Sequence, residues 1–166
     1  MDLRAGELRP DVAEDWRWAD QYIPFVKATL KKYAMHIVDF EVAPIDKDMT
    51  EGTDMVVRVS GGDVAVRIRR DDCRFRDLTI RAWRKSGAKT EIDKIRAGHI
   101  DFYLYCWTDK EDGLIRDYIL VDINIARDSG LFDDGSLILN PDKRTGFYPY
   151  SIQRLEEVGA LIASTL

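Results

Sequence analysis

Arginines alternate along one short segment of the chain, where their guanidinium groups could bind phosphate. Arg67 and Arg69 are two residues apart in the segment 64–70, and Arg81 follows in the next apolar segment. Planar guanidinium groups match the geometry of phosphate oxygens, and several on one sheet face add their fields. The alternative is a solvated sheet face with cross-strand ion pairs, of which Asp54 with Arg69 would be one. The residue types alone leave both interpretations open.

The charge of the chain is unevenly distributed along the sequence. Residues 58–99 contain 12 Lys/Arg and 6 Asp/Glu, whereas the rest of the chain contains 13 Lys/Arg and 24 Asp/Glu. The middle is therefore locally +6 in a chain whose formal net charge is −5. A basic middle between acidic ends is typical of a concentrated anion-binding face.

The basic segment 64–70 is expected to be the second arm of a β-hairpin. It alternates between apolar and polar side chains, as does the segment 55–59, and this is the pattern of strands with one buried face. Between them, Gly61 and Gly62 supply the positive φ angles that a tight two-residue turn requires. With this loop, the predicted cross-strand pairs are Val59 with Val64, Val57 with Val66, Met55 with Ile68, Arg58 with Ala65, Val56 with Arg67, and Asp54 with Arg69. The first three pairs are expected to be buried, and the polar residues share the opposite face: Asp54, Arg58, Arg67 and Arg69.

Helices and further strands are expected on both sides of this hairpin. The expected helices are 12–33, with a kink or break at Pro24, 91–97, and a last one that follows Ser151 and carries the stripe Leu155, Val158 and Ile162. The expected strands are 36–42, 75–83, 100–108 and 115–126, with a loop over 128–150. Thr90 and Asp93 form the pattern of a capping box, and Gly98 supplies a C-terminal stop. The aromatic residues of one strand are interpreted as core, with base stacking as the alternative: Phe102, Tyr103, Tyr105 and Trp107.

This order of elements resembles the PD-(D/E)xK nuclease-like superfamily of restriction-type and phage-type endonucleases. The resemblance covers roughly residues 11–126. It implies an α/β fold with a mixed central sheet, an antiparallel meander, flanking helices and a restriction-endonuclease-like core. In that superfamily, an acid on the second core strand and an acid-x-Lys triplet on the third hold a divalent metal ion. Asp54 matches the first acid, whereas Arg67 stands at the position of the second carboxylate and Arg69 at that of the lysine. Three runs also resemble phage-associated proteins of this kind, in which such arginines belong to the family pattern: 64–69, 78–81 and 89–91.

The departure from the family pattern favours binding over cleavage. A divalent cation needs oxygen ligands and usually more than one carboxylate, so Arg67 would repel the ion that it should help to hold. The preferred hypothesis is a nuclease-like protein that contacts nucleic acid, DNA in the first instance, through its phosphates. Its expected contacts are Arg58, Arg67, Arg69, Arg81 and Lys94.

Two alternatives stay open. In the first, a live Mg²⁺-dependent endonuclease takes its missing acid from the following helix, so that Asp54 and Glu91 hold the metal ion. Lys94 or Arg69 would then stabilise the developing phosphorane charge. The residues of such a catalytic site are Asp54, Arg67, Arg69 and Glu91. The other acids considered are Asp93, Glu14 and Asp20. In the second alternative, a protein-interaction or inhibitor module meets its partner through its acidic ends and binds no nucleic acid.

Length and cysteine content limit the class of protein. A chain of 166 residues fits one domain, here 1–166, and can fold without disulfide staples. Cys73 and Cys106 lie far apart without metal-type spacing, which predicts a reducing, cytoplasmic location. We see no signal pattern and no membrane-spanning run, so no membrane role is expected. A homodimer is left open.

Overall fold

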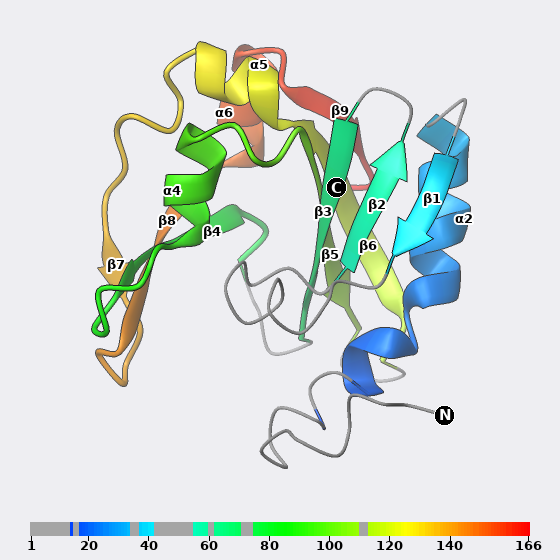
Figure 1. The fold of residues 1–166 in the computed structure, drawn as a ribbon, viewed down its shortest axis with the longest axis horizontal. Coiled ribbons are helices and arrows are strands. Elements are labelled where there is room, and N and C mark those ends of the chain that lie inside the picture. The colour runs from blue at the N-terminus through cyan, green and yellow to red at the C-terminus, as the bar shows by residue number, and fades with distance from the viewer. Residues whose placement is uncertain are drawn as a thin grey trace.

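The computed structural model describes residues 14, 17–33, 37–41, 55–59, 62–70, 75–109 and 113–166. Within them the protein is of the α/β class, with two β-sheets and several short helices (Figure 1). The larger sheet contains β1 (Ile37–Glu41), β2 (Met55–Val59), β3 (Gly62–Arg69), β5 (Phe102–Thr108), β6 (Ile115–Asp122) and β9 (Leu161–Ser164), in that order. The smaller sheet contains β4 (Leu78–Arg84), β8 (Thr145–Tyr150) and β7 (Ile138–Leu139), in that order. The labelled helices are α2 (Ile23–Tyr33), α4 (Glu91–Arg96), α5 (Ile123–Asp128) and α6 (Ile152–Glu157), and residues 17–20 are also helical.

The larger sheet is mixed, as the sequence predicted. β1, β2 and β3 form an antiparallel meander. β5 then pairs with β3 in parallel, and β6 and β9 continue antiparallel. Parallel neighbours need a crossover connection, and here the chain between β3 and β5 contains both β4 and α4. The crossover therefore brings α4 and the smaller sheet into contact with the larger one.

Both faces of the larger sheet are covered (Figure 1). On one face α2 packs against β3, β5 and β6, and this cluster includes Val26, Leu30, Val64, Val66, Ile68, Leu104 and Leu120. On the other face α4 and β4 pack against β5, and this cluster includes Leu78, Ile80, Ile92, Ile95, Tyr103, Tyr105 and Trp107. The predicted burial of Val64, Val66 and Ile68 is confirmed. The opposite face of β3 is not a solvated surface, since Ala65 on it is only 4% exposed.

The β2–β3 hairpin has a register two residues away from the predicted one. The observed partners are Val59 with Gly62, Arg58 with Asp63, Val57 with Val64, Val56 with Ala65, and Met55 with Val66. Gly62 therefore belongs to β3 and is not, as was predicted, one of two loop glycines. A shift of two residues keeps each residue on its predicted face, because side chains alternate with a period of two. The predicted pair of Asp54 with Arg69 stays a prediction, because Asp54 lies outside the described residues.

Gly62 is required by a close contact rather than by a turn conformation. It lies inside β3, and its φ angle is not in the positive, left-handed region. A Cβ at this position would lie 2.7 Å from the Cβ of Asp101, so only glycine fits. The same Asp101 accepts a hydrogen bond from the backbone N–H of Asp63 at 2.8 Å and donates its own N–H to the Asp63 carbonyl at 3.2 Å. These contacts draw Gly62 and Asp63 into the strand, which explains the shifted register.

Helix α4 begins as predicted, with its capping residues in place. The Asp93 carboxylate accepts hydrogen bonds from the backbone N–H of Thr90 at 2.7 Å and from its hydroxyl at 2.8 Å. The first of these bonds in particular lowers the pKa of Asp93 below its usual value. Gly98, with φ of 75°, follows the helix end as the sequence indicated. The cap fixes the start of the helix at Glu91, which is buried beside the larger sheet.

Two predictions for the second half of the chain are wrong. The strand expected to reach residue 126 ends at Asp122, because the Asp122 side chain accepts the N–H of Ile125 at 3.0 Å and starts α5. The expected loop 128–150 contains β7 and β8, and β8 is held by pairing along β4. Local β-propensity does not report a helix cap, and it does not report a partner strand far away in the sequence.

The last helix is also shorter than predicted. Ser151 caps α6 as expected and accepts the N–H of Arg154, but the helix ends at Glu157. Gly159, with φ of 73°, then turns the chain into β9, which pairs with β6. Ile162 therefore lies on an edge strand, 45% exposed, and is not part of a helical apolar stripe.

Other predictions are confirmed. Tyr103, Tyr105 and Trp107 are core residues, each at most 1% exposed, and so cannot stack on bases. The first helix is divided as Pro24 indicated: residues 17–20 are helical, 21 and 22 form a turn, and α2 starts at Ile23 with Pro24 in its first turn. Among the described residues, no helix combines the length and apolarity needed to cross a membrane.

Candidate anion-binding site

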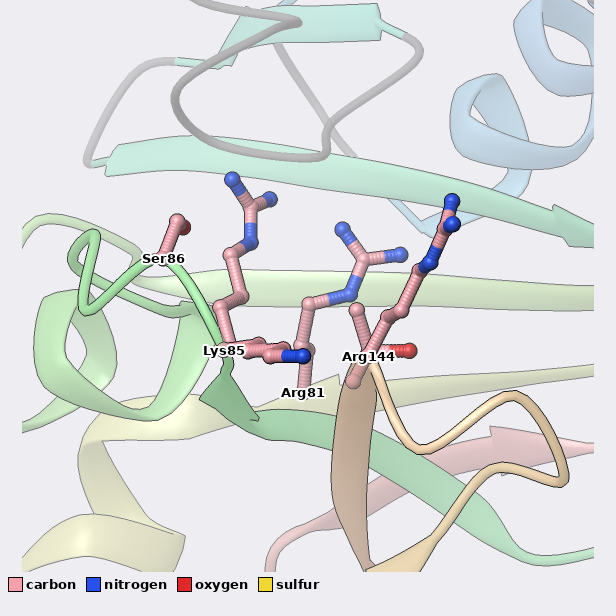
Figure 2. A pocket seen from close by; sticks show the side chains of 6 residues that line it. Arg81, Lys85, Ser86 and Arg144 are labelled. Carbon is pink, nitrogen blue, oxygen red and sulfur yellow. The ribbon is translucent and has the colours of Figure 1, made fainter.

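An open pocket of about 500 Å³ lies at the end of the smaller sheet where β4 and β8 meet (Figure 2). Its lining residues are Arg81, Arg84, Lys85, Ser86, Arg144 and Thr145. Four of the six are cationic, the other two carry hydroxyl groups, and none is acidic or aromatic. Figure 2 shows the side chains of Arg81 and Arg144 extending to the same side of the sheet. The lining is therefore suited to an anion.

A β-bulge places two of these arginines on the same side of β4. Arg81 lies opposite Phe147, whereas Trp83 lies opposite Gly146, so β4 contains one extra residue at Ala82. In a regular strand, side chains three positions apart point to opposite faces. The inserted residue reverses this relation, and both Arg81 and Arg84 line the pocket.

The β7–β8 hairpin positions Arg144 beside them. The N–H of Asn140 bonds to the carbonyl of Thr145 at 2.9 Å, and Lys143 takes a left-handed conformation, with φ of 52°, in the turn. The backbone N–H of Lys85 donates to the carbonyl of Arg144 at 2.9 Å, which extends the β4–β8 ladder to the pocket rim. Cations from two distant parts of the sequence are thereby held around one opening.

The cations of the pocket lack anionic partners within the described part of the chain. There, the side chains of Arg81, Arg84, Lys85 and Arg144 form no hydrogen bond or ion pair. Burial lowers the pKa of Arg81, and the positive charges of Arg67 and Arg84 lower it further, against the opposing effect of Glu91. A half-buried guanidinium that lies among like charges is costly unless an anion compensates it.

Glu91 lies beneath the pocket and binds donors from three strands. Its Oε1 accepts hydrogen bonds from Arg67 Nη1 at 2.9 Å and from the Tyr103 hydroxyl at 2.6 Å. Its Oε2 accepts from Arg67 Nη1 at 2.9 Å and from the backbone N–H of Arg81 at 2.8 Å. Glu91 is 3% exposed, so its charge is compensated inside the protein, by Arg67 in particular. Burial and the nearby Glu91 charge in turn raise the pKa of Tyr103 well above its usual value, which keeps this donor protonated.

The structure brings three of the predicted site residues together: Arg67, Arg81 and Glu91. Arg69 lies partly buried at the end of β3, and Lys94 is buried on α4. For Arg58 the structure describes the backbone, which pairs with Asp63 rather than with Ala65. Asp54 lies outside the described residues, so the predicted metal pair of Asp54 with Glu91 stays a prediction. Among the residues that are described, no group of three or more His, Cys, Asp or Glu could hold a metal ion.

Sequence reasoning missed Arg84, Lys85 and Arg144. The first two lie in the basic middle of the chain, where the charge count gave a signal, but regular alternation would have placed Arg84 opposite to Arg81. Arg144 gave no signal in the sequence, because it lies in an acidic region that was expected to be a loop.

The chain matches no protein-family model, and no curated protein sequence matches it. The chemistry of the pocket and of the residues beneath it is therefore the basis of the function proposed below.

The Glu91 network predicts a large asymmetry between two substitutions. Glu91→Ala removes the buried carboxylate that accepts from Arg67, Tyr103 and the Arg81 backbone, so it should lower the free energy of unfolding by about 3–5 kcal/mol. Glu91→Gln keeps an oxygen acceptor and should lose less, roughly 1–3 kcal/mol. Urea unfolding of the two variants measures both values.

Glu156→Ala is the control for this experiment, because Glu156 is an exposed acid on another helix and should change stability by less than about 0.5 kcal/mol. The double variant Arg67→Met/Glu91→Leu removes both charges and should recover part of the loss. A Glu91→Ala protein as stable as the control would show that the network does not support the fold.

Proposed function

We propose that this protein binds nucleic acid through phosphate contacts in the cationic pocket of Arg81, Arg84, Lys85 and Arg144. We further propose that it is a binding protein and not a nuclease. The observation that carries the proposal is the set of four cations without anionic partners in the described part of the chain. Guanidinium groups bind phosphate oxygens in a bidentate manner, and phosphate contacts provide most of the affinity of non-specific nucleic-acid binding. We propose DNA as the ligand to test first, and the cytoplasm as the location of the protein.

The order of elements supports the nuclease-like part of this proposal. Helix α2, the meander β1-β2-β3, helix α4 and strand β5 follow one another as in the superfamily pattern, with β4 inserted before α4. β5 lies parallel to β3 after the crossover. A shared fold does not imply a shared activity, so the function is argued from the pocket.

The contacts of Glu91 argue against a live endonuclease. Both of its oxygens already accept hydrogen bonds, and Arg67 occupies the space beside them. A metal ion at Glu91 would have to displace a buried ion pair and lie next to a guanidinium. Metal-dependent cleavage would therefore depend on Asp54, with Mg²⁺ as the cofactor in that case.

Substitution of the pocket arginines tests nucleic-acid binding more cleanly than substitution of Arg67. Removing Arg67 leaves the buried Glu91 charge unpaired, so a loss of binding in that variant would not separate folding from contact. The pocket arginines have no such partner among the described residues, so we expect their removal to leave the fold intact. The competing protein-interaction module, which acts through the acidic ends, requires no salt-dependent binding of nucleic acid.

The triple variant Arg81→Gln/Arg84→Gln/Arg144→Gln should weaken binding to duplex DNA of any sequence. Each lost phosphate contact reduces the slope of log Kobs against log salt by about one, so the slope should fall by roughly two to three. Fluorescence anisotropy with labelled duplexes at several salt concentrations measures both affinity and slope.

A matched control removes the same charge elsewhere. Lys31→Gln/Lys32→Gln/Arg154→Gln lies on α2 and α6, away from the pocket, and should keep most of the affinity and the slope. If the two triple variants weaken DNA binding equally, the loss of affinity results from the change in net charge and not from the pocket. Wild-type protein that binds no DNA at low salt would favour the protein-interaction module.

Purified protein should show little cleavage of plasmid or linear DNA in Mg²⁺, because the pairing of Arg67 with Glu91 engages the carboxylate that would hold the ion together with Asp54. Gel assays with Mg²⁺ and with EDTA measure this. Asp54→Asn is the decisive variant, since Glu91→Gln also disturbs the fold. Cleavage that follows the protein through purification and is lost in a folded Asp54→Asn variant would contradict the non-catalytic proposal and favour the endonuclease.

A further inference from the structure

We infer that the cationic pocket receives a terminal phosphate, the phosphomonoester at the end of a nucleic-acid strand, in preference to the phosphodiesters within the strand. This inference deepens the proposed function and rests on it. It names the part of the nucleic acid that enters the pocket.

The cations converge on one opening instead of forming a row. They come from β4, from the turn after β4 and from the turn before β8, and all line the same pocket of about 500 Å³. Internal phosphates carry a single charge each and are spread along the strand, so proteins that follow a strand use extended grooves. A phosphomonoester concentrates about −1.5 to −2 charges and three terminal oxygens on one group. Convergent cations match that concentrated charge.

The two hydroxyl groups of the lining can donate to an incoming anion. Thr145 Oγ1 already accepts a hydrogen bond from Asn140 Nδ2 at 2.6 Å, and Ser86 Oγ accepts one from the N–H of Ala88 at 3.4 Å. A hydroxyl that accepts from the protein retains its own proton for donation. The lining thus offers guanidinium, ammonium and hydroxyl donors, with no carboxylate to compete for them.

The lining contains no aromatic side chain on which a base could stack. Sequence-tolerant binding of single strands normally uses such side chains. The aromatic residues of β5, Tyr103, Tyr105 and Trp107, are buried in the core and do not supply them. The pocket therefore recognises the charged end group, and the attached nucleotides extend out of its open side.

The test compares oligonucleotides of one sequence that differ in their ends alone: 5′-phosphate, 3′-phosphate and hydroxyl at both ends. Competition against a labelled 5′-phosphorylated strand at pH 7.5 and fixed ionic strength gives the relative affinities. We expect one of the two phosphorylated oligonucleotides to bind about tenfold more tightly than the oligonucleotide with hydroxyl groups at both ends. Comparison of the 5′-phosphate with the 3′-phosphate shows which end the pocket prefers. The ratio should shrink below about pH 6, where the phosphomonoester takes up a proton.

Two variants connect this preference with the pocket. The triple variant Arg81→Gln/Arg84→Gln/Arg144→Gln should bind all three oligonucleotides equally. Arg81→Lys keeps the charge but loses the bidentate fork, so it should reduce the ratio while the fold, followed by its urea midpoint, is unchanged.

The outcomes separate this inference from the proposed function. Equal, salt-dependent binding of phosphorylated and hydroxyl-ended strands would overturn the terminal-phosphate inference and leave nucleic-acid binding in place. No binding of any oligonucleotide would overturn both. Competition by inorganic phosphate or by a nucleoside monophosphate at the same concentration as the oligonucleotide would overturn the inference of a strand end and favour free phosphate or a small phosphomonoester as the ligand.

Discussion

The buried carboxylate of Glu91 connects the two sheets of this protein. It stands at the first position of α4, fixed there by the Thr90–Asp93 cap, and accepts hydrogen bonds from Arg67 of β3, Tyr103 of β5 and the backbone of Arg81 in β4. A charge that is 3% exposed must be paired and fully hydrogen-bonded, so each of these donors constrains the position of the others. The smaller sheet is held against the larger one through this carboxylate as well as through the apolar contacts of β4 and α4.

This network also explains why the pocket cations are available for a ligand. Glu91 beneath the pocket is engaged by Arg67, while its carboxylate also holds the backbone N–H of Arg81. The Arg81 guanidinium then lines the pocket beside Arg84 and Arg144 with no described partner of its own. The arrangement carries an electrostatic cost in the unbound protein, and a bound phosphate would offset that cost. Sites that are destabilised in this way are expected where a protein binds an oppositely charged ligand.

Features that depend on local sequence were predictable. Apolar alternation located β2 and β3, Pro24 indicated the break before α2, and the Thr90–Asp93 pattern indicated the start of α4. The aromatic strand was correctly interpreted as core. These signals arise within a few residues of one another, where propensity and capping determine the conformation.

Features that depend on distant contacts were not predictable. The contact with Asp101 shifted the hairpin register by demanding Gly62, and no pattern near the hairpin reports it. The bulge at Ala82 placed Arg84 in the pocket against the expectation of regular alternation. Glu91 had the sequence signature of a surface acid in a first helical turn, but the crossover buries it. Of the four pocket cations, Arg81 was therefore identified from sequence, whereas Arg84, Lys85 and Arg144 required the structure of β4 and its pairing with β8.

Titration followed by ¹H–¹⁵N spectra of the arginine Nε–H groups tests the central claim most directly, because it reports each guanidinium separately. As a 5′-phosphorylated oligonucleotide is added at fixed salt, we expect the signals of Arg81, Arg84 and Arg144 to shift together and to saturate. Arg127, which bonds to Asn124 and Asp128, and Arg154 on α6 should stay in place. Saturable binding in which the pocket arginines do not move, while other arginines do, would contradict the assignment of this pocket as the phosphate site.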